Sequence, residues 1–205
     1  MLSFGVLAAA ALATAAVQAA ETPAQQAVAA FRGLCGTGEL APGAVLARAD
    51  ALGWRRGGAD APKDFDPAAD RLSPKGTLPL ELYVTSETSA GERRDVCGLR
   101  VTSPIPGLDA AVEAWLGFKP SFAMPPAATF LAVRTGEAWA SGATVDRAAF
   151  AKLKAEGRYY SIMAADGGSG GQDQAPAMLM LLHVRRLSTA DRAPAPPPRP
   201  PRPAR

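Results

Sequence analysis

The two cysteines, Cys35 and Cys97, constrain the fold of this chain more than any other feature. Cys35 continues an apolar stripe with Val28 and Phe31 at the three- and four-residue spacing of a helix. Cys97 shares one face of an alternating, strand-like segment with Leu99. Both sulfurs are therefore expected on the covered side of their elements, where a bond between them would clamp the first helix to a strand.

The N-terminal residues 1–19 have the pattern of a signal peptide. Residues 6–17 form an uncharged run of Val, Leu, Ala and one Thr, which is shorter than the roughly 20 residues of a membrane-spanning helix. Val17 and Ala19 occupy the positions that a signal peptidase reads, so cleavage is expected after Ala19. The alternative is a buried N-terminal helix, because no Lys or Arg precedes the run. We expect a periplasmic or secreted protein.

Export makes a disulfide the expected state of Cys35 and Cys97, because isolated cysteine pairs oxidise outside the cytosol. The alternative is a reduced, catalytic thiol. His183, the only histidine, would then act as its general base in a small hydrolase.

Composition points to one globular domain of residues 20–187. The chain has 205 residues and is 48% hydrophobic, and its Ala, Gly, Pro and Arg content suggests a GC-rich bacterial genome. From residue 185 onward six Arg and one Asp contribute +5 to the net charge of +3, which leaves −2 for the rest. The near-neutral body argues against a nucleic-acid partner, which would require a basic folded face.

The hydrophobic patterns predict alternating helices and hairpins after one leading helix. Such an order favours an α+β fold, with a mainly antiparallel sheet of hairpins, helices packed on one face and the leading helix clipped by the disulfide. A long polar loop is expected over residues 55–76. The expected helices cover about 23–35, 42–52, 108–116 and 144–156, and the expected strands about 78–85, 95–101, 129–134, 139, 159–164 and 178–184. The inner face of the second helix is expected to carry Val45, Ala49 and Leu52. Thr144 is expected to cap the fourth helix, whose inward residues would be Val145, Ala149, Phe150 and Leu153.

No motif identifies a catalytic, metal or cofactor site. Residues 167–171 match the nucleophile pattern G-x-S-x-G, but a strand rather than a helix follows, which favours a hairpin tip. The loop aspartates lack the glycine and glutamate of a calcium loop, and one histidine is too few for a zinc site of ordinary type. These loop aspartates are Asp60, Asp64, Asp66 and Asp70.

The C-terminal residues 188–205 are expected to form a disordered Pro/Arg-rich tail. Arg199, Arg202 and Arg205 recur every third residue, which places them along one edge of a polyproline helix. Such an edge could bind an anionic envelope surface, and the alternative is a solvated tail without a partner. After removal of the signal peptide we expect no membrane span.

The segments 31–35 (FRGLC) and 49–54 (ADALGW) resemble the N-terminal part of certain small exported proteobacterial proteins that have no assigned function. The resemblance covers only the first third of the mature chain. It implies a paired second cysteine, a role open to Cys97, and no catalytic residue. We therefore expect a non-enzymatic binding or envelope-associated module, with the small hydrolase as the alternative.

Overall fold

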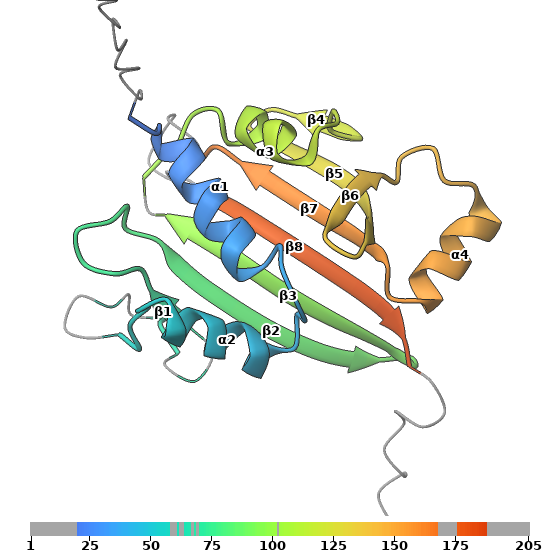
Figure 1. Ribbon diagram of the computed structural model, residues 1–205, viewed down its shortest axis with the longest axis horizontal. Helices are drawn as coiled ribbons and strands as arrows, with labels where there is room; N and C mark the ends of the chain where they lie inside the picture. Colours follow the sequence, from blue (N-terminus) through green and yellow to red (C-terminus); the bar gives the residue numbers. More distant parts are fainter. Residues whose placement is uncertain are drawn as a thin grey trace, which may run out of the picture.

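A computed structural model of the chain describes residues 20–57, 61, 64–66, 68, 70–101, 103–167 and 176–187. Within these residues one antiparallel sheet has the strand order β1-β2-β3-β8-β7-β5-β4, and β6 pairs with β5. Three helices, α1 to α3, lie across one face, and α4 lies beside the end of the sheet (Figure 1). We call the face beneath α1 to α3 the inner face and the opposite one the open face. The predicted α+β class is confirmed.

The helices and strands have the following bounds. The helices are α1 (Pro23–Leu34), α2 (Pro42–Ala51), α3 (Leu108–Leu116) and α4 (Arg147–Ala155). The strands are β1 (Asp70–Leu72), β2 (Glu81–Ser89), β3 (Glu92–Val101), β4 (Phe122–Met124), β5 (Ala127–Thr135), β6 (Ala138–Ser141), β7 (Tyr159–Ala165) and β8 (Ala177–Arg186).

Helix α1 begins and ends as its sequence predicts. The Thr22 hydroxyl accepts a hydrogen bond from the Gln25 backbone (3.2 Å), and the Gln25 side chain accepts one from the Thr22 backbone (2.8 Å). Cys35 caps the other end and is bonded to Cys97 on β3, with a Cα–Cα distance of 5.6 Å. The predicted clip between the first helix and an inner strand is confirmed.

The β2–β3 hairpin supplies the centre of the helix-covered core. Its two turn residues, Ala90 and Gly91, both have positive φ angles (51° and 77°), as in the tight turns that match strand twist. Strand β2 therefore continues to Ser89, beyond its predicted end at residue 85. The inward residues Leu82, Val84, Cys97 and Leu99 are at most 2% exposed, which confirms the predicted alternation.

Two helical predictions are corrected. Leu52 was expected on the inner face of α2, but the helix ends at Ala51 and Leu52 is 56% exposed. The left-handed Gly53 turns the chain there, so Leu52 points away from the sheet. For α4 the expected cap was Thr144, whereas the Asp146 carboxylate accepts from the Ala149 backbone (2.8 Å).

The expected inward face of α4 is also corrected, because none of its residues is buried. The helix lies at the sheet end, and its Phe150 contacts Tyr159 with ring centroids 4.7 Å apart. Two short strands were missed as well. Strand β1 lies in the predicted loop and β4 in a Pro-rich connection, and both have only three residues, too few to show alternation.

Candidate binding site

His183 occupies a core position on the inner face of β8. Its ring stacks on Tyr160 (centroids 4.7 Å apart), and Nε2 donates to the Gly157 carbonyl at 3.0 Å. Nδ1 lies 3.9 Å from the Asp95 carboxylate. Burial lowers the pKa of His183, although the Gly157 carbonyl and the Asp95 charge act in the opposite direction. These contacts hold a neutral imidazole in place at neutral pH.

The two cysteines offer no nucleophile in this structure. The Cys35 and Cys97 sulfurs are bonded to each other, and both residues are 0% exposed. Hydrolysis by a thiolate would therefore require a reduced form of the protein. The pairing of Cys35 or Cys97 with His183 in a hydrolase stays a prediction about that form.

The loop aspartates are engaged in separate interactions. Asp64 accepts from Arg100 at 2.9 Å, and the Asp70 carboxylate accepts from the Asp66 backbone at 2.8 Å. Asp60 lies outside the described residues. Across the part of the chain that the structure describes, no three His, Cys, Asp or Glu side chains gather closely enough to hold a metal ion.

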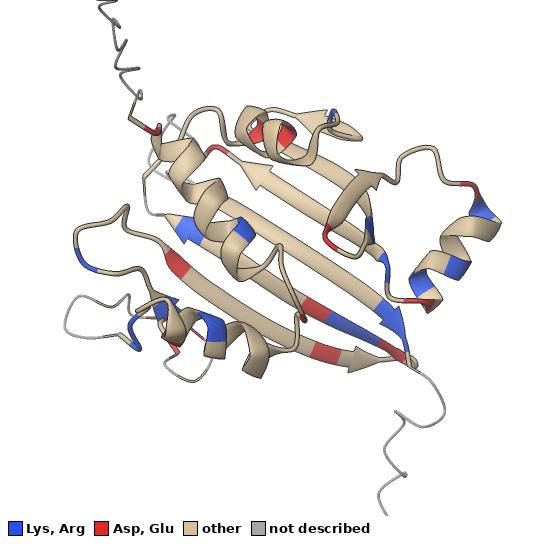
Figure 2. Cartoon of the chain, viewed as in Figure 1, with Lys and Arg blue, Asp and Glu red and all other residues tan. Residues whose placement is uncertain are grey.

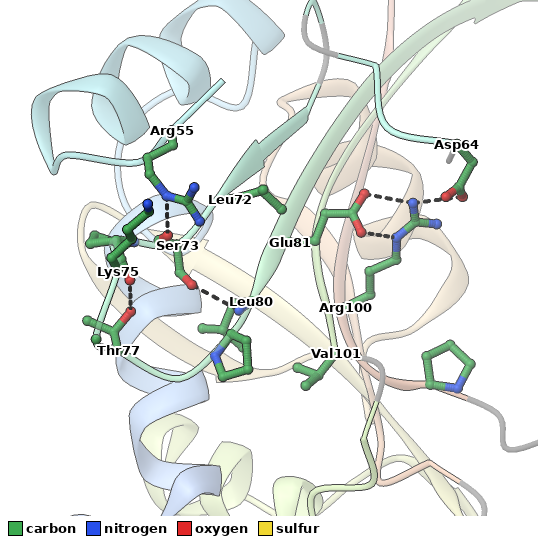
Figure 3. Close-up of a pocket in the computed structure, with 14 residues that line it drawn as sticks. Arg55, Asp64, Leu72, Ser73, Lys75, Thr77, Leu80, Glu81, Arg100 and Val101 are labelled. Atoms are coloured by element: carbon green, nitrogen blue, oxygen red, sulfur yellow. Dashed lines mark hydrogen bonds and ion pairs between the residues drawn. The ribbon is translucent and has the colours of Figure 1, made fainter. Parts of the chain in front are cut away.

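A pocket of about 710 Å³ lies where the loop before β2 meets the end of β3. Leu72, Leu80 and Val101 supply apolar surface, and each is at most 9% exposed. Figure 3 shows Arg55 and Lys75 on one side of Leu80, with charged residues of β2 and β3 on the other. Ligand sites commonly combine such apolar surface with a few polar groups, and this volume lies in their usual range.

An ion-pair network fixes the wall formed by β2 and β3. The Glu81 carboxylate accepts from Nε and from a terminal nitrogen of Arg100, at 2.8 and 2.7 Å. The same terminal nitrogen donates to Asp64 at 2.9 Å. The hydrogen bond to Glu81, more than any other effect, raises the pKa of Arg100, which stays cationic at every accessible pH. This wall is thus rigid and carries both signs of charge.

The opposite wall is a loop held by its own hydrogen bonds. The Ser73 hydroxyl donates to the Leu78 carbonyl (2.8 Å) and accepts from the Leu80 backbone (3.0 Å). Arg55 Nε donates to the Ser73 carbonyl at 3.2 Å, so the guanidinium is anchored beside the pocket (Figure 3). Lys75 is exposed at the loop tip and adds a second positive charge.

Five charged residues line this pocket, and the sequence singled out only Asp64, as a candidate calcium ligand. Sequence reasoning missed the other four, Arg55, Lys75, Glu81 and Arg100. For two of them a signal was present. A two-residue turn at Ala90 and Gly91 places Glu81 opposite Arg100, and this pairing is present in the register. For Arg55 and Lys75 we find no such signal, because their positions depend on how the long loop returns to the sheet edge.

The predicted signal peptide (1–19) and tail (188–205), including Arg199, Arg202 and Arg205, lie outside the described residues. So do residues 168–171 of the glycine-rich motif, although the flanking strands β7 and β8 do pair as a hairpin would. No helix in the described ranges is long and apolar enough to span a membrane.

Compared with known proteins, the chain matches no family model, no curated protein and no solved structure.

Proposed function

We propose that the protein is an exported, non-enzymatic binding module. It would take a small molecule with an apolar body and an anionic group in the pocket beside the start of β2. One observation carries this proposal: apolar surface from Leu72, Leu80 and Val101 adjoins two cationic side chains in a single pocket. The buried Cys35–Cys97 bond is compatible with export, because disulfides persist in oxidising compartments.

The anionic group follows from the charges around the pocket. The positive charge of Arg100 is already matched by Glu81 and Asp64. Lys75 stands on the other side of Leu80, exposed at the loop tip and available to an anionic ligand, and Arg55 adds positive charge to the same wall (Figure 3). An apolar chain on Leu80 with its carboxylate toward Lys75 would satisfy both parts of the pocket.

Titration of the mature protein with octanoate, octanamide and octylamine, followed by NMR, tests the proposal. Octanoate should bind most tightly of the three, with shifts at Leu80 and Val101. Lys75→Glu should weaken octanoate binding about tenfold, because a hydrogen bond to a charged group contributes about 1.5 kcal/mol. The matched control is Lys119→Glu, which removes a cation that is paired with Glu113 outside the pocket.

If octanoate and octanamide bind equally tightly, the pocket does not require an anionic group on its ligand. If Lys75→Glu and Lys119→Glu weaken octanoate binding equally, Lys75 does not contact the bound carboxylate. If none of the three probes shifts Leu80 or Val101 at 10 mM, roughly the weakest binding of interest, the pocket is not a site for such molecules.

A second candidate activity is adhesion to an anionic envelope surface through residues 188–205. The three-residue recurrence of Arg199, Arg202 and Arg205 favours it. Vesicles containing an anionic lipid should retain the full mature chain and release it as salt rises, and they should not retain a chain ending at Leu187. If the vesicles retain both chains equally, residues 188–205 do not carry the adhesion.

The small-hydrolase hypothesis has a direct test in the exported protein. A mass two hydrogens below that of the reduced chain, with no reaction toward iodoacetamide, would exclude Cys35 and Cys97 as nucleophiles. A reactive thiol in the exported protein would instead favour the hydrolase over the binding module.

A further inference from the structure

The open face of the sheet carries every methionine of the chain except Met1. Side chains alternate along strands, and the register places Met163 opposite Met180 and Met180 opposite Gly98. Met178 belongs to the same face, because its sulfur accepts a hydrogen bond from Tyr83, which lies opposite Gly98. Met124, on the edge strand β4, is 79% exposed.

The rest of the open face is apolar in the middle. The register joins Val96, Leu182, Ser161 and Leu131 into one row across β3, β8, β7 and β5. None of these four side chains is fully buried. Figure 2 shows no charged residue along the middle of β7 and β8, whereas charges gather at the strand ends. Val96, Leu182 and Leu131 thus form a part-exposed apolar row that only the small Ser161 interrupts, and contiguous exposed apolar surface of this kind marks interaction sites.

The two ends of this face carry opposite charge. At one end the described residues include four carboxylates, Asp64, Asp66, Asp70 and Glu81, and the cation Arg100, which pairs with two of them. At the other end Glu92 is surrounded by three cations, and Glu87 lies opposite Arg94. The three cations around Glu92 are Lys154, Arg94 and Arg186.

We propose that the open face binds the same face of a second copy of this chain, as two sheets stacked face to face. A two-fold axis perpendicular to the strands brings the acidic end of one copy over the basic end of the other. The same axis lays the row that contains Leu182 and Ser161 over itself. Methionine side chains adapt to such a contact because they are unbranched and polarisable.

The size of the face fits this partner. Five long strands, β2, β3, β8, β7 and β5, spaced about 4.8 Å apart give a width of about 24 Å, and the rows from Glu81 to Glu87 span about 20 Å. With about 50 Å² from each of the three-residue edge strands β1 and β4, the face covers roughly 600 Å², which reaches the lower limit of what each partner buries in a stable interface. Paired sheets also prefer a stacking in which their strands lie within about 30° of one another, as this axis allows.

Sedimentation of the mature protein over about 1–100 µM, a range suited to micromolar association, tests this proposal. We expect a dimer that weakens as salt rises. Met180→Glu should raise the dissociation constant at least tenfold, while Leu52→Glu should leave it unchanged. Leu52 is the matched control because it is a 56% exposed apolar residue at the end of α2, and α2 lies on the helical side of the sheet (Figure 1).

A milder variant keeps the test decisive if Met180→Glu does not fold. Ser161→Cys changes one oxygen to sulfur on the row beside the axis. Because stacked sheets lie about 10 Å apart, which is too far for a direct disulfide, a short bis-maleimide that adds one thiol to each of its two double bonds should join two copies through residue 161. Leu52→Cys should not link copies. A wild-type protein that stays monomeric at 100 µM, or equal cross-linking of the two cysteine variants, would overturn the proposal. Neither measurement depends on octanoate binding, so the dimer proposal and the ligand-pocket proposal are tested independently of each other.

Discussion

Reduction of the Cys35–Cys97 bond should lower the free energy of unfolding by about 4 kcal/mol. The two cysteines are 62 residues apart in sequence. A cross-link that closes a loop of that length removes about 14 cal/mol/K of entropy from the unfolded chain, or about 4 kcal/mol at 25 °C. Because the bond acts mainly on the unfolded state, the loss should appear even if the folded structure scarcely changes.

Urea unfolding of the mature protein, with and without reductant, measures this difference. With a slope of about 2 kcal/mol/M, the midpoint should fall by about 2 M. The reduced protein should remain folded if its starting stability lies in the usual range of about 5–15 kcal/mol. Phe31 and Leu34, both 0% exposed, still hold α1 on the sheet in that state.

The matched control is the double variant Cys35→Ala/Cys97→Ala, in which reductant has no bond to break. Its midpoint should not respond to reductant. A change of less than about 1 kcal/mol in the wild type would refute the entropic reasoning, since the loop length alone then fails to account for the stabilisation. An equal response in the double variant would show that reductant acts elsewhere.

Three further variants test local features of the fold. Gly98→Val should destabilise the protein by about 1–3 kcal/mol in urea unfolding, because a Cβ at residue 98 would collide with the Tyr83 ring; a neutral result would contradict the close packing of that ring. Wild-type stability should decline as pH falls below about 6.5, because the lowered pKa of His183 lets the unfolded chain bind the proton first; thermal melts of His183→Gln should show a smaller decline between pH 7.5 and 5. Val45→Ala should cost at least about 1 kcal/mol at its 0% exposed position, whereas Leu52→Ala should change stability by less than about 0.5 kcal/mol, and similar costs would mean that Leu52 is covered after all.

Much of the fold was predictable because it depends on neighbours in the sequence. The Thr22 cap and the helical stripe ending at Cys35 are local, and so is the alternation around Cys97. Each side chain there faces inward because of the helical or strand period. Two inward cysteines, in a chain that the sequence predicts to be exported, were enough to predict the bond between a helix and a strand.

The pocket and the open face were not predictable in the same way. Strand order decides which side chains become neighbours, and β8 pairs with β3 although about 75 residues separate them. That pairing brings Met180 beside Gly98. The position of Lys75 depends likewise on where a long loop meets the sheet edge. Such contacts depend on the packing of the whole chain, which no local pattern records.

The sequence alone thus determined the covered faces of the main elements and the link between Cys35 and Cys97. Tertiary structure decided which strand edges met, and so which polar and apolar side chains gathered on the surface. The physical reason is that backbone periodicity acts over a few residues, whereas pairing between distant strands is selected by the burial of the entire core.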